Sequence, residues 1–142
     1  MTDSQDLFVS EQHPVSRRWA VIEDDGCVAW LYLTEPDSQK PAADCWLYNR
    51  VPSPSQFESE RGESPVVPQT HAADIAGFEP PVEESVHLRW SRDGESVAVL
   101  FDLELIGFIV SGQKRGFSKH LRASGPFGSV LDRELFGRVF EL

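Results

Sequence analysis

The chain has 142 residues, of which 40% are hydrophobic and 25% charged, and its formal net charge is −10. A chain of this length can hold the core of one domain without metal or disulfides, and its composition excludes collagen, coiled coil and wholesale disorder. No apolar run approaches the roughly 18 residues that cross a bilayer, and the polar, acidic residues 1–6 lack the basic and apolar parts of a secretory signal, so we expect a cytoplasmic protein with no membrane partner.

The first 16 residues are polar apart from one apolar triplet at positions 7–9, and we expect a loosely ordered N-terminus or an edge strand there. Residues 17–142 are expected to form a single antiparallel β domain. It opens with two runs rich in strand formers on either side of Asp25-Gly26. An Asp-Gly pair in this position is typical of a tight β-hairpin, because both central residues of the turn need positive φ.

A two-residue turn at Asp25-Gly26 predicts that Ala20 pairs with Leu31. A third run of strand formers covers residues 43–51 and would place Cys45 beside Leu31. Cys27 then lies about four rungs away, on the order of 13 Å at ~3.3 Å per residue. That separation is too large for a disulfide, so we expect two free thiols.

Residues 52–85 differ from the rest of the chain, with six prolines among serine, glutamate and glutamine. A long loop without regular structure is uncommon inside a compact domain and is usually functional or disordered. We expect a proline-rich surface loop that does not divide the chain into two domains.

The clearest β signal lies in residues 86–110. Two strand-like runs flank Asp93-Gly94, and a turn there predicts that Leu88 pairs with Val99. A second tight turn would set Phe108 opposite Val99 as well. This three-stranded meander would gather its apolar side chains on one face, an arrangement that a slip of one residue would destroy.

The stretch Leu88–Ala98 resembles the Trp-Ser-x-Asp-Gly hairpin that recurs in β-propeller blades of the TolB type, through Trp90-Ser91 and Asp93-Gly94. A propeller needs several such blades around an axis. The other Asp-Gly hairpin of this chain, at Asp25-Gly26, lacks the Trp-Ser pair. The resemblance therefore implies a tight local hairpin and carries no function.

Near the C-terminus, Ser129 followed by Asp132 is similar to a helix N-cap with a capping box. Apolar residues then recur at helical spacing through Phe140. Together the elements predict a mainly β (α+β) fold: two antiparallel β-meanders of about three strands each, with a short C-terminal amphipathic helix. A twisted sheet with a helix on one face, a β-sandwich and a half-open barrel are alternative arrangements.

Charge is distributed unevenly. Residues 1–104 carry 20 acidic and 7 basic residues, whereas residues 105–131 carry four basic residues and no acid. An acidic body argues against general nucleic-acid binding, which depends on neutralising phosphates. Residues 113–122, here called the basic segment, lead toward the predicted helix N-terminus, where free N–H groups favour anions.

The basic segment is our first candidate site, for a small anion or an acidic protein partner. Its residues are Lys114, Arg115, Lys119, His120 and Arg122. The alternative is that these side chains pair with acids elsewhere in the fold. A second candidate is an aromatic face of the first meander, shared by Trp30, Trp46 and Tyr48. Such a face is typical of a stacking platform for sugars or bases, or of a core.

The two cysteines and four histidines do not occur at the spacings of zinc sites, and no nucleophile elbow is present. We therefore expect no metal and no cofactor. These patterns favour a small, non-catalytic interaction or adaptor module of bacterial type. The alternatives are a domain that binds a small ligand (an anion, sugar or nucleotide) through the basic segment or the aromatic face, and an enzyme with a dispersed site.

Overall fold

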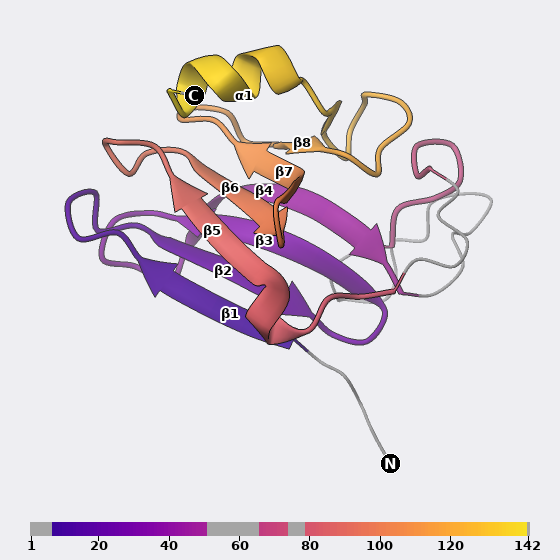
Figure 1. Cartoon of the computed structure of the whole chain (residues 1–142), viewed down its shortest axis with the longest axis horizontal. Helices are drawn as coiled ribbons and strands as arrows, with labels where there is room; N and C mark the ends of the chain where they lie inside the picture. Colours follow the sequence, from indigo (N-terminus) through magenta and orange to yellow (C-terminus); the bar gives the residue numbers. More distant parts are fainter. Residues whose placement is uncertain (1–6, 51–65, 74–78, 142) are drawn as a thin grey trace.

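The computed structural model describes residues 7–50, 66–73 and 79–141. They form two β-sheets that lie face to face, with a short helix against the outer face of the second sheet (Figure 1). The prediction of a mainly β fold with antiparallel meanders and a C-terminal helix is confirmed. The described residues form a β-sandwich and do not close into a barrel.

The first sheet has the strand order β1-β2-β3-β4 and is antiparallel. Its strands are β1 (Leu7–Gln12), β2 (Trp19–Asp24), β3 (Val28–Thr34) and β4 (Pro41–Asn49). The second sheet has the order β5-β6-β7-β8-β9, and its last pair is parallel. Its strands are β5 (Val86–Trp90), β6 (Val97–Phe101), β7 (Glu104–Ile109), β8 (Phe117–Ser118) and β9 (Ser129–Val130). A 3₁₀ turn, η1 (Glu83–Ser85), precedes β5, and the helix α1 spans Arg133–Val139.

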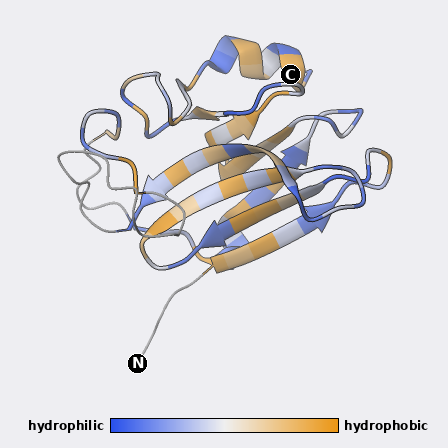
Figure 2. Cartoon of the chain, turned by 180° about the vertical axis from the view of Figure 1, so that it is seen from behind, coloured by the Kyte–Doolittle hydropathy of each residue, from blue (hydrophilic) through white to orange (hydrophobic). Residues whose placement is uncertain are grey.

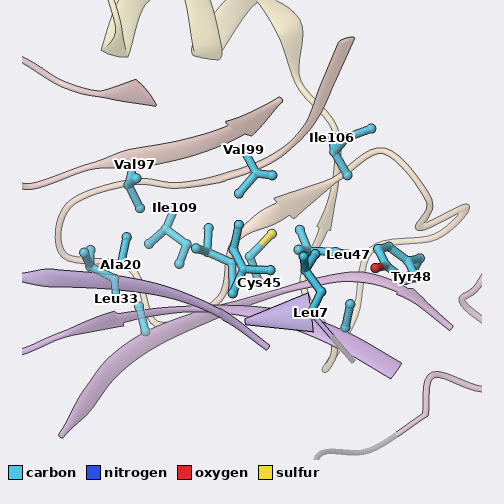
Figure 3. Close-up of a cluster of buried hydrophobic side chains, with 14 residues drawn as sticks. Leu7, Ala20, Leu33, Cys45, Leu47, Tyr48, Val97, Val99, Ile106 and Ile109 are labelled. Atoms are coloured by element: carbon cyan, nitrogen blue, oxygen red, sulfur yellow. The ribbon is translucent and has the colours of Figure 1, made fainter. Parts of the chain in front are cut away.

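The main core lies between the two sheets (Figure 3). Hydrophobic and hydrophilic residues alternate along the strands (Figure 2), as expected where one face of a sheet is buried. The buried side chains come from both sheets and include Ile22, Leu31, Cys45, Leu47, Val97, Val99 and Ile109. This shared core positions the edges of the sheets relative to one another.

The N-terminal region contributes an edge strand, one of the two outcomes expected for it. β1 pairs along its whole length with β2, with Val9 opposite Ile22. Leu7 is buried in the main core. The apolar triplet at positions 7–9 is therefore strand and not loose terminus, while residues 1–6 lie outside the described part of the chain.

The turn between β2 and β3 is longer than predicted. Ala20 lies opposite Leu33, so its predicted pairing with Leu31 is wrong by two residues. Asp25 explains the longer turn, since its carboxylate accepts hydrogen bonds at 2.9 and 3.1 Å from the amides two and three residues further on. Because the β2–β3 register is displaced by two residues, the side chains of these two strands keep their predicted faces.

A β-bulge between β3 and β4 separates two aromatic residues that were predicted to share a face. Trp30 lies opposite Trp46, but Ala29 lies opposite Tyr48, so one extra residue, Leu47, is accommodated in β4. Tyr48 therefore points into the main core, whereas Trp46 packs on the outer face of the sheet. The predicted shared face of Trp46 and Tyr48 is wrong.

The two cysteines lie far apart along the strands, as predicted. Cys45 is opposite Leu31, and the Cys27 carbonyl accepts a hydrogen bond from Arg50, at the far end of β4. Neither cysteine is in a disulfide, so the prediction that they do not pair with each other is confirmed.

The β5–β6 hairpin has the predicted register, with Leu88 opposite Val99. The next pairing differs: Val99 lies opposite Gly107, and Phe108 lies opposite Ala98, so the predicted Phe108–Val99 pairing is wrong. A bulge next to Val99 shifts the register by one residue and turns Phe108 to the outer face of the sheet. Both faces of this hairpin are therefore covered.

The helix α1 covers that outer face. Its N-cap is Asp132, whose side chain accepts a hydrogen bond from the Leu135 amide at 3.0 Å, so the predicted N-cap at Ser129 is wrong. Ser129 instead begins β9. The predicted apolar stripe of the helix packs on the sheet, with the Phe136 ring 5.6 Å from the Phe108 ring.

Part of the proline-rich stretch belongs to the core. Val66 and Val67 are buried against Trp30 and Trp46 on the outer face of the first sheet. Leu121 belongs to the same buried cluster. Residues 66–73, here called the docked segment, therefore pack on the first sheet through Val66, Val67 and Ala72, whereas residues 52–65 and 74–78 of the expected loop lie outside the described part of the chain.

Candidate functional site

Two cations of the basic segment form ion pairs within the fold. Nη1 of Arg115 lies 2.7 and 2.6 Å from the carboxylate oxygens of Asp44. Burial raises the pKa of Asp44, and the neighbouring Arg115 opposes that shift. Lys119 pairs with Glu104 at the start of β7. The sequence could not indicate these partners, because the fold brings them from other strands.

The remaining residues of the basic segment lie apart. His120 is 6% exposed, and its Nδ1 lies 2.8 Å from the Leu47 carbonyl. The Arg122 guanidinium donates two hydrogen bonds, of 2.9 and 2.6 Å, to the Gln69 carbonyl. The exposed Lys114 forms no ion pair with any described residue. These contacts favour the alternative in which the segment ties strands and loops together.

The three candidate aromatic residues are buried. Trp30, Trp46 and Tyr48 are 3%, 1% and 0% exposed. Residues 66–73 cover the two tryptophans, and the second sheet covers the tyrosine. A stacking platform needs an open ring face, so this arrangement favours their role in the core.

A buried polar network lies beside Tyr48. Its hydroxyl donates to Oδ2 of Asp24 at 2.6 Å, and Arg50 donates to the same oxygen at 2.9 Å. Oδ1 of Asp24 accepts from the Gly26 amide at 2.9 Å. Burial, and then the neighbouring Asp24, raise the pKa of Tyr48. Asp24 is 1% exposed. A buried carboxylate needs hydrogen-bond partners, and Tyr48, Arg50 and the Gly26 amide supply them, so the network acts as structural support.

The described residues contain no group of three or more His, Cys, Asp or Glu side chains arranged to hold a metal ion. Burial raises the pKa of the Cys45 thiol, which donates to the Phe117 carbonyl at 3.2 Å and is enclosed by the core. The part of the chain that the structure describes also has no helix long and apolar enough to span a membrane.

The sheet edges differ in how they are protected. The edge of β4 is bridged to the basic segment: the Asp44 amide donates to the Lys114 carbonyl and the Asp44 carbonyl accepts from Gly116. β9 has only two residues. In β5, the first amide is bonded to the Glu83 carbonyl, and Arg89 projects from the strand. Short strands, basic side chains and covering segments are the usual means of blocking strand addition.

Within the described residues, β1 has no backbone partner on its outer side, although the turn η1 contacts the strand. Its sequence, LFVSEQ, contains no proline, lysine, arginine or bulge. The His13 amide donates to the Arg18 carbonyl, and this pair continues the β1–β2 register. Because bonded and non-bonded pairs alternate in an antiparallel ladder, Phe8, Ser10 and Gln12 point their backbone groups away from β2.

The outward edge of β1 is therefore available for hydrogen bonding. Within the described residues, the backbone groups of Phe8, Ser10 and Gln12 make no bond outside the sheet. Phe8 is 62% exposed, and Ser10 is also exposed. Three N–H donors and three C=O acceptors thus lie along one accessible strand, beside a large apolar side chain.

The chain was compared with protein-family models, with curated proteins and with solved structures. None of the three comparisons finds a match. Any functional argument therefore rests on the geometry of the chain itself.

The sequence contained one signal for this edge, the apolar triplet at positions 7–9 in a polar N-terminal region. That triplet indicated a strand, but it did not indicate which other strands would lie beside it. Whether Ser10 faces a partner strand or solvent depends on sheet order, which follows from contacts far away in the chain. The candidate site was missed for that reason.

Proposed function

We propose that the protein is a non-catalytic, cytoplasmic interaction module that binds an extended segment of a partner protein beside β1. The segment would become a fifth strand of the first sheet. The observation that carries the proposal is the row of unbonded backbone groups at Phe8, Ser10 and Gln12. In strand addition, such main-chain bonds supply affinity and alternate side-chain contacts supply specificity. The two cysteines, neither of which is in a disulfide, support the cytoplasmic assignment, since reducing compartments disfavour disulfides.

Amide exchange measured by NMR tests the proposal directly. The probe is a synthetic nine-residue peptide of alternating threonine and valine, which is neutral and favours extended structure. In the free protein, the amides of Phe8, Ser10 and Gln12 should exchange fast, whereas those of Val9 and Glu11 should be protected by β2. Adding the peptide should slow exchange at the first three amides.

A proline substitution separates binding from folding. Ser10→Pro removes an outward N–H and blocks the edge, but it breaks no β1–β2 bond, because proline is tolerated where the N–H faces solvent. We expect lost peptide binding with nearly unchanged thermal stability, and normal binding by the control Ser10→Ala. Peptides N-methylated at alternate residues should also fail to bind. Protection of Phe8, Ser10 and Gln12 in the free protein, or no change with any unmodified peptide, would contradict the proposal.

A further inference from the structure

We infer that the segment added to β1 is basic, with lysine or arginine alternating with apolar residues. This inference rests on the proposed function and names the chemistry of its partner. The feature behind it is the set of carboxylates around the open edge. Glu11 lies on β1, and Glu23 lies opposite Phe8 on β2. The turn η1, which contacts β1 and leads into β5 (Figure 1), adds Glu83 and Glu84.

These four carboxylates lack cationic partners among the described residues. All four residues are exposed. Glu11 accepts a hydrogen bond of 2.6 Å from Nε1 of Trp90, which carries no charge. Glu23, Glu83 and Glu84 form no ion pair within the described ranges. Four carboxylates without cationic partners in the described residues thus lie on β1, on its neighbour β2 and on η1, which contacts β1.

The cations of the β1–β2 turn are already engaged. Arg17 and Arg18 lie in the turn between β1 and β2, where Arg17 pairs with Asp37 at 2.9 Å and Arg18 pairs with Glu95 at 2.7 Å. Both cations are therefore paired with acids outside this set of four carboxylates. A segment that brings its own cations would gain attraction on approach and when bound, while an acidic segment would be repelled.

Charge also decides against a second copy of this chain as the occupant. Pairing β1 with β1 would bring two acidic edges together, and each chain carries a net charge of −10. Like charges placed opposite one another destabilise a strand pair. A basic partner removes that repulsion, and its apolar residues can contact the exposed Phe8.

Three peptides of equal length test this inference, with amide exchange at Phe8, Ser10 and Gln12 as the readout so that only binding at the edge is counted. They alternate valine with lysine, threonine or glutamate. At low salt we expect the lysine peptide to bind roughly tenfold more tightly than the threonine peptide, and the glutamate peptide to bind most weakly. Raising the ionic strength should reduce the difference.

A matched pair of protein variants locates the charge effect. Glu83→Gln with Glu84→Gln should raise the Kd of the lysine peptide roughly three- to tenfold and leave that of the threonine peptide unchanged. The control, Glu134→Gln with Glu141→Gln, removes the same charge near α1, on the side of the molecule away from β1 (Figure 1), and should change neither Kd.

The outcomes distinguish the two proposals. If no peptide protects the outward amides, the proposed function fails. If the threonine peptide binds and the lysine peptide binds no more tightly, or if the control variant weakens binding as much as the η1 variant, the basic partner is wrong while strand addition stands. A dimer in sedimentation that Ser10→Pro abolishes would identify a second copy as the occupant and would also overturn the basic partner.

Discussion

At the scale of single residues, His120 shows how the basic segment is tied into the fold. Its ring is buried, and Nδ1 lies 2.8 Å from the Leu47 carbonyl in β4. Its own carbonyl accepts a hydrogen bond from the Ala73 amide at 2.7 Å. One residue thus connects β4, the basic segment and the docked segment 66–73. Burial lowers the pKa of His120, and nearby Lys119 lowers it further, although the Leu47 carbonyl opposes the shift.

This lowered pKa predicts a pH dependence of stability. Folding favours the neutral ring, so the unfolded chain binds the proton more readily. The stabilising effect is complete above the ordinary histidine value of 6.5 and is lost as the pH falls through the lower value of the folded protein. We expect the free energy of unfolding, measured by urea titration, to decrease from pH 7.5 to 5.5.

Two variants isolate the contribution of His120. His120→Asn keeps a donor near the Leu47 carbonyl and removes the titrating ring, so the slope between pH 7.5 and 5.5 should become shallower. The control His87→Gln, at an exposed position on β5, should keep the wild-type slope. Equal slopes in all three proteins would show that His120 does not cause the dependence.

At the scale of elements, glycines allow the two sheets to meet closely at Cys45. A Cβ atom on Gly116 would lie 2.6 Å from the Phe108 carbonyl oxygen and 2.7 Å from Cβ of Cys45. A Cβ atom on Gly107 would lie 2.8 Å from Sγ of Cys45. Backbone atoms form part of this contact, so the crowding could be relieved only by moving strands. The crossing of β4 with the basic segment therefore depends on glycine.

We predict that Gly116→Ala lowers the free energy of unfolding by about 1–3 kcal/mol, the usual cost of overpacking. Gly137→Ala is the control, because Gly137 lies in α1 and an added Cβ would meet nothing within 4 Å. It should raise stability by up to about 1 kcal/mol, since alanine favours the helix. Urea titration measures both. Equal effects of the two substitutions would rule out close packing at Gly116.

The long strands of the two meanders were predictable from the sequence, whereas the two-residue strands β8 and β9 were not, and register was predictable only where the turn was tight. Asp93-Gly94 gave the correct β5–β6 pairing because no extra residue enters that hairpin. The β2–β3 and β6–β7 pairings were displaced by the capped turn at Asp25 and by the bulge next to Val99. Both features depend on local hydrogen bonds and packing that do not change the alternation of apolar residues.

The candidate sites illustrate the same limit. The charge of Arg115 was visible in the sequence, but its partner Asp44 lies 71 positions away. The sequence indicates an aromatic face, but it does not indicate that Val66 and Val67 pack against Trp30. The openness of β1 depends on the order of strands in its sheet. Long-range contacts decide all three properties, and composition and periodicity do not report them.

At the scale of the whole molecule, the two sides of the sandwich are closed differently. On one side, Asp44 joins β4 to the basic segment by backbone bonds and by the ion pair with Arg115. On the other side, side chains link β1 and β5: Glu11 accepts from Trp90, whose ring lies 5.2 Å from that of His13. Backbone hydrogen bonds therefore close the β4 side of the sandwich, whereas the outward backbone groups of β1 can still bind another strand.

Charge reversal tests whether the cations of the basic segment stabilise the fold through their ion pairs. Changing Lys114, Arg115, Lys119 and Arg122 to glutamate would place new carboxylates beside Asp44 and Glu104. We expect the free energy of unfolding to fall by about 2 kcal/mol, from two lost ion pairs and the repulsion that replaces them. Lys114→Glu alone should change stability by less than about 0.5 kcal/mol. An unchanged melting temperature of the quadruple variant would instead indicate that these cations serve an external anion.

Asp44 and Arg115 form the contact that closes the edge of β4, and they are far apart in the sequence. This separation has a consequence during protein synthesis. Strands β1 to β4 are complete once residue 49 is made, but Arg115, which pairs with Asp44, is made 66 residues later. At about 5–20 residues per second, a ribosome needs on the order of 3–13 s to reach it. During that interval β4 is an unsealed edge on a nascent chain. Until residues 114–116 are made, β4 therefore lacks the backbone partner that it has in the folded chain, and an exposed strand edge of this kind can pair with a neighbouring chain.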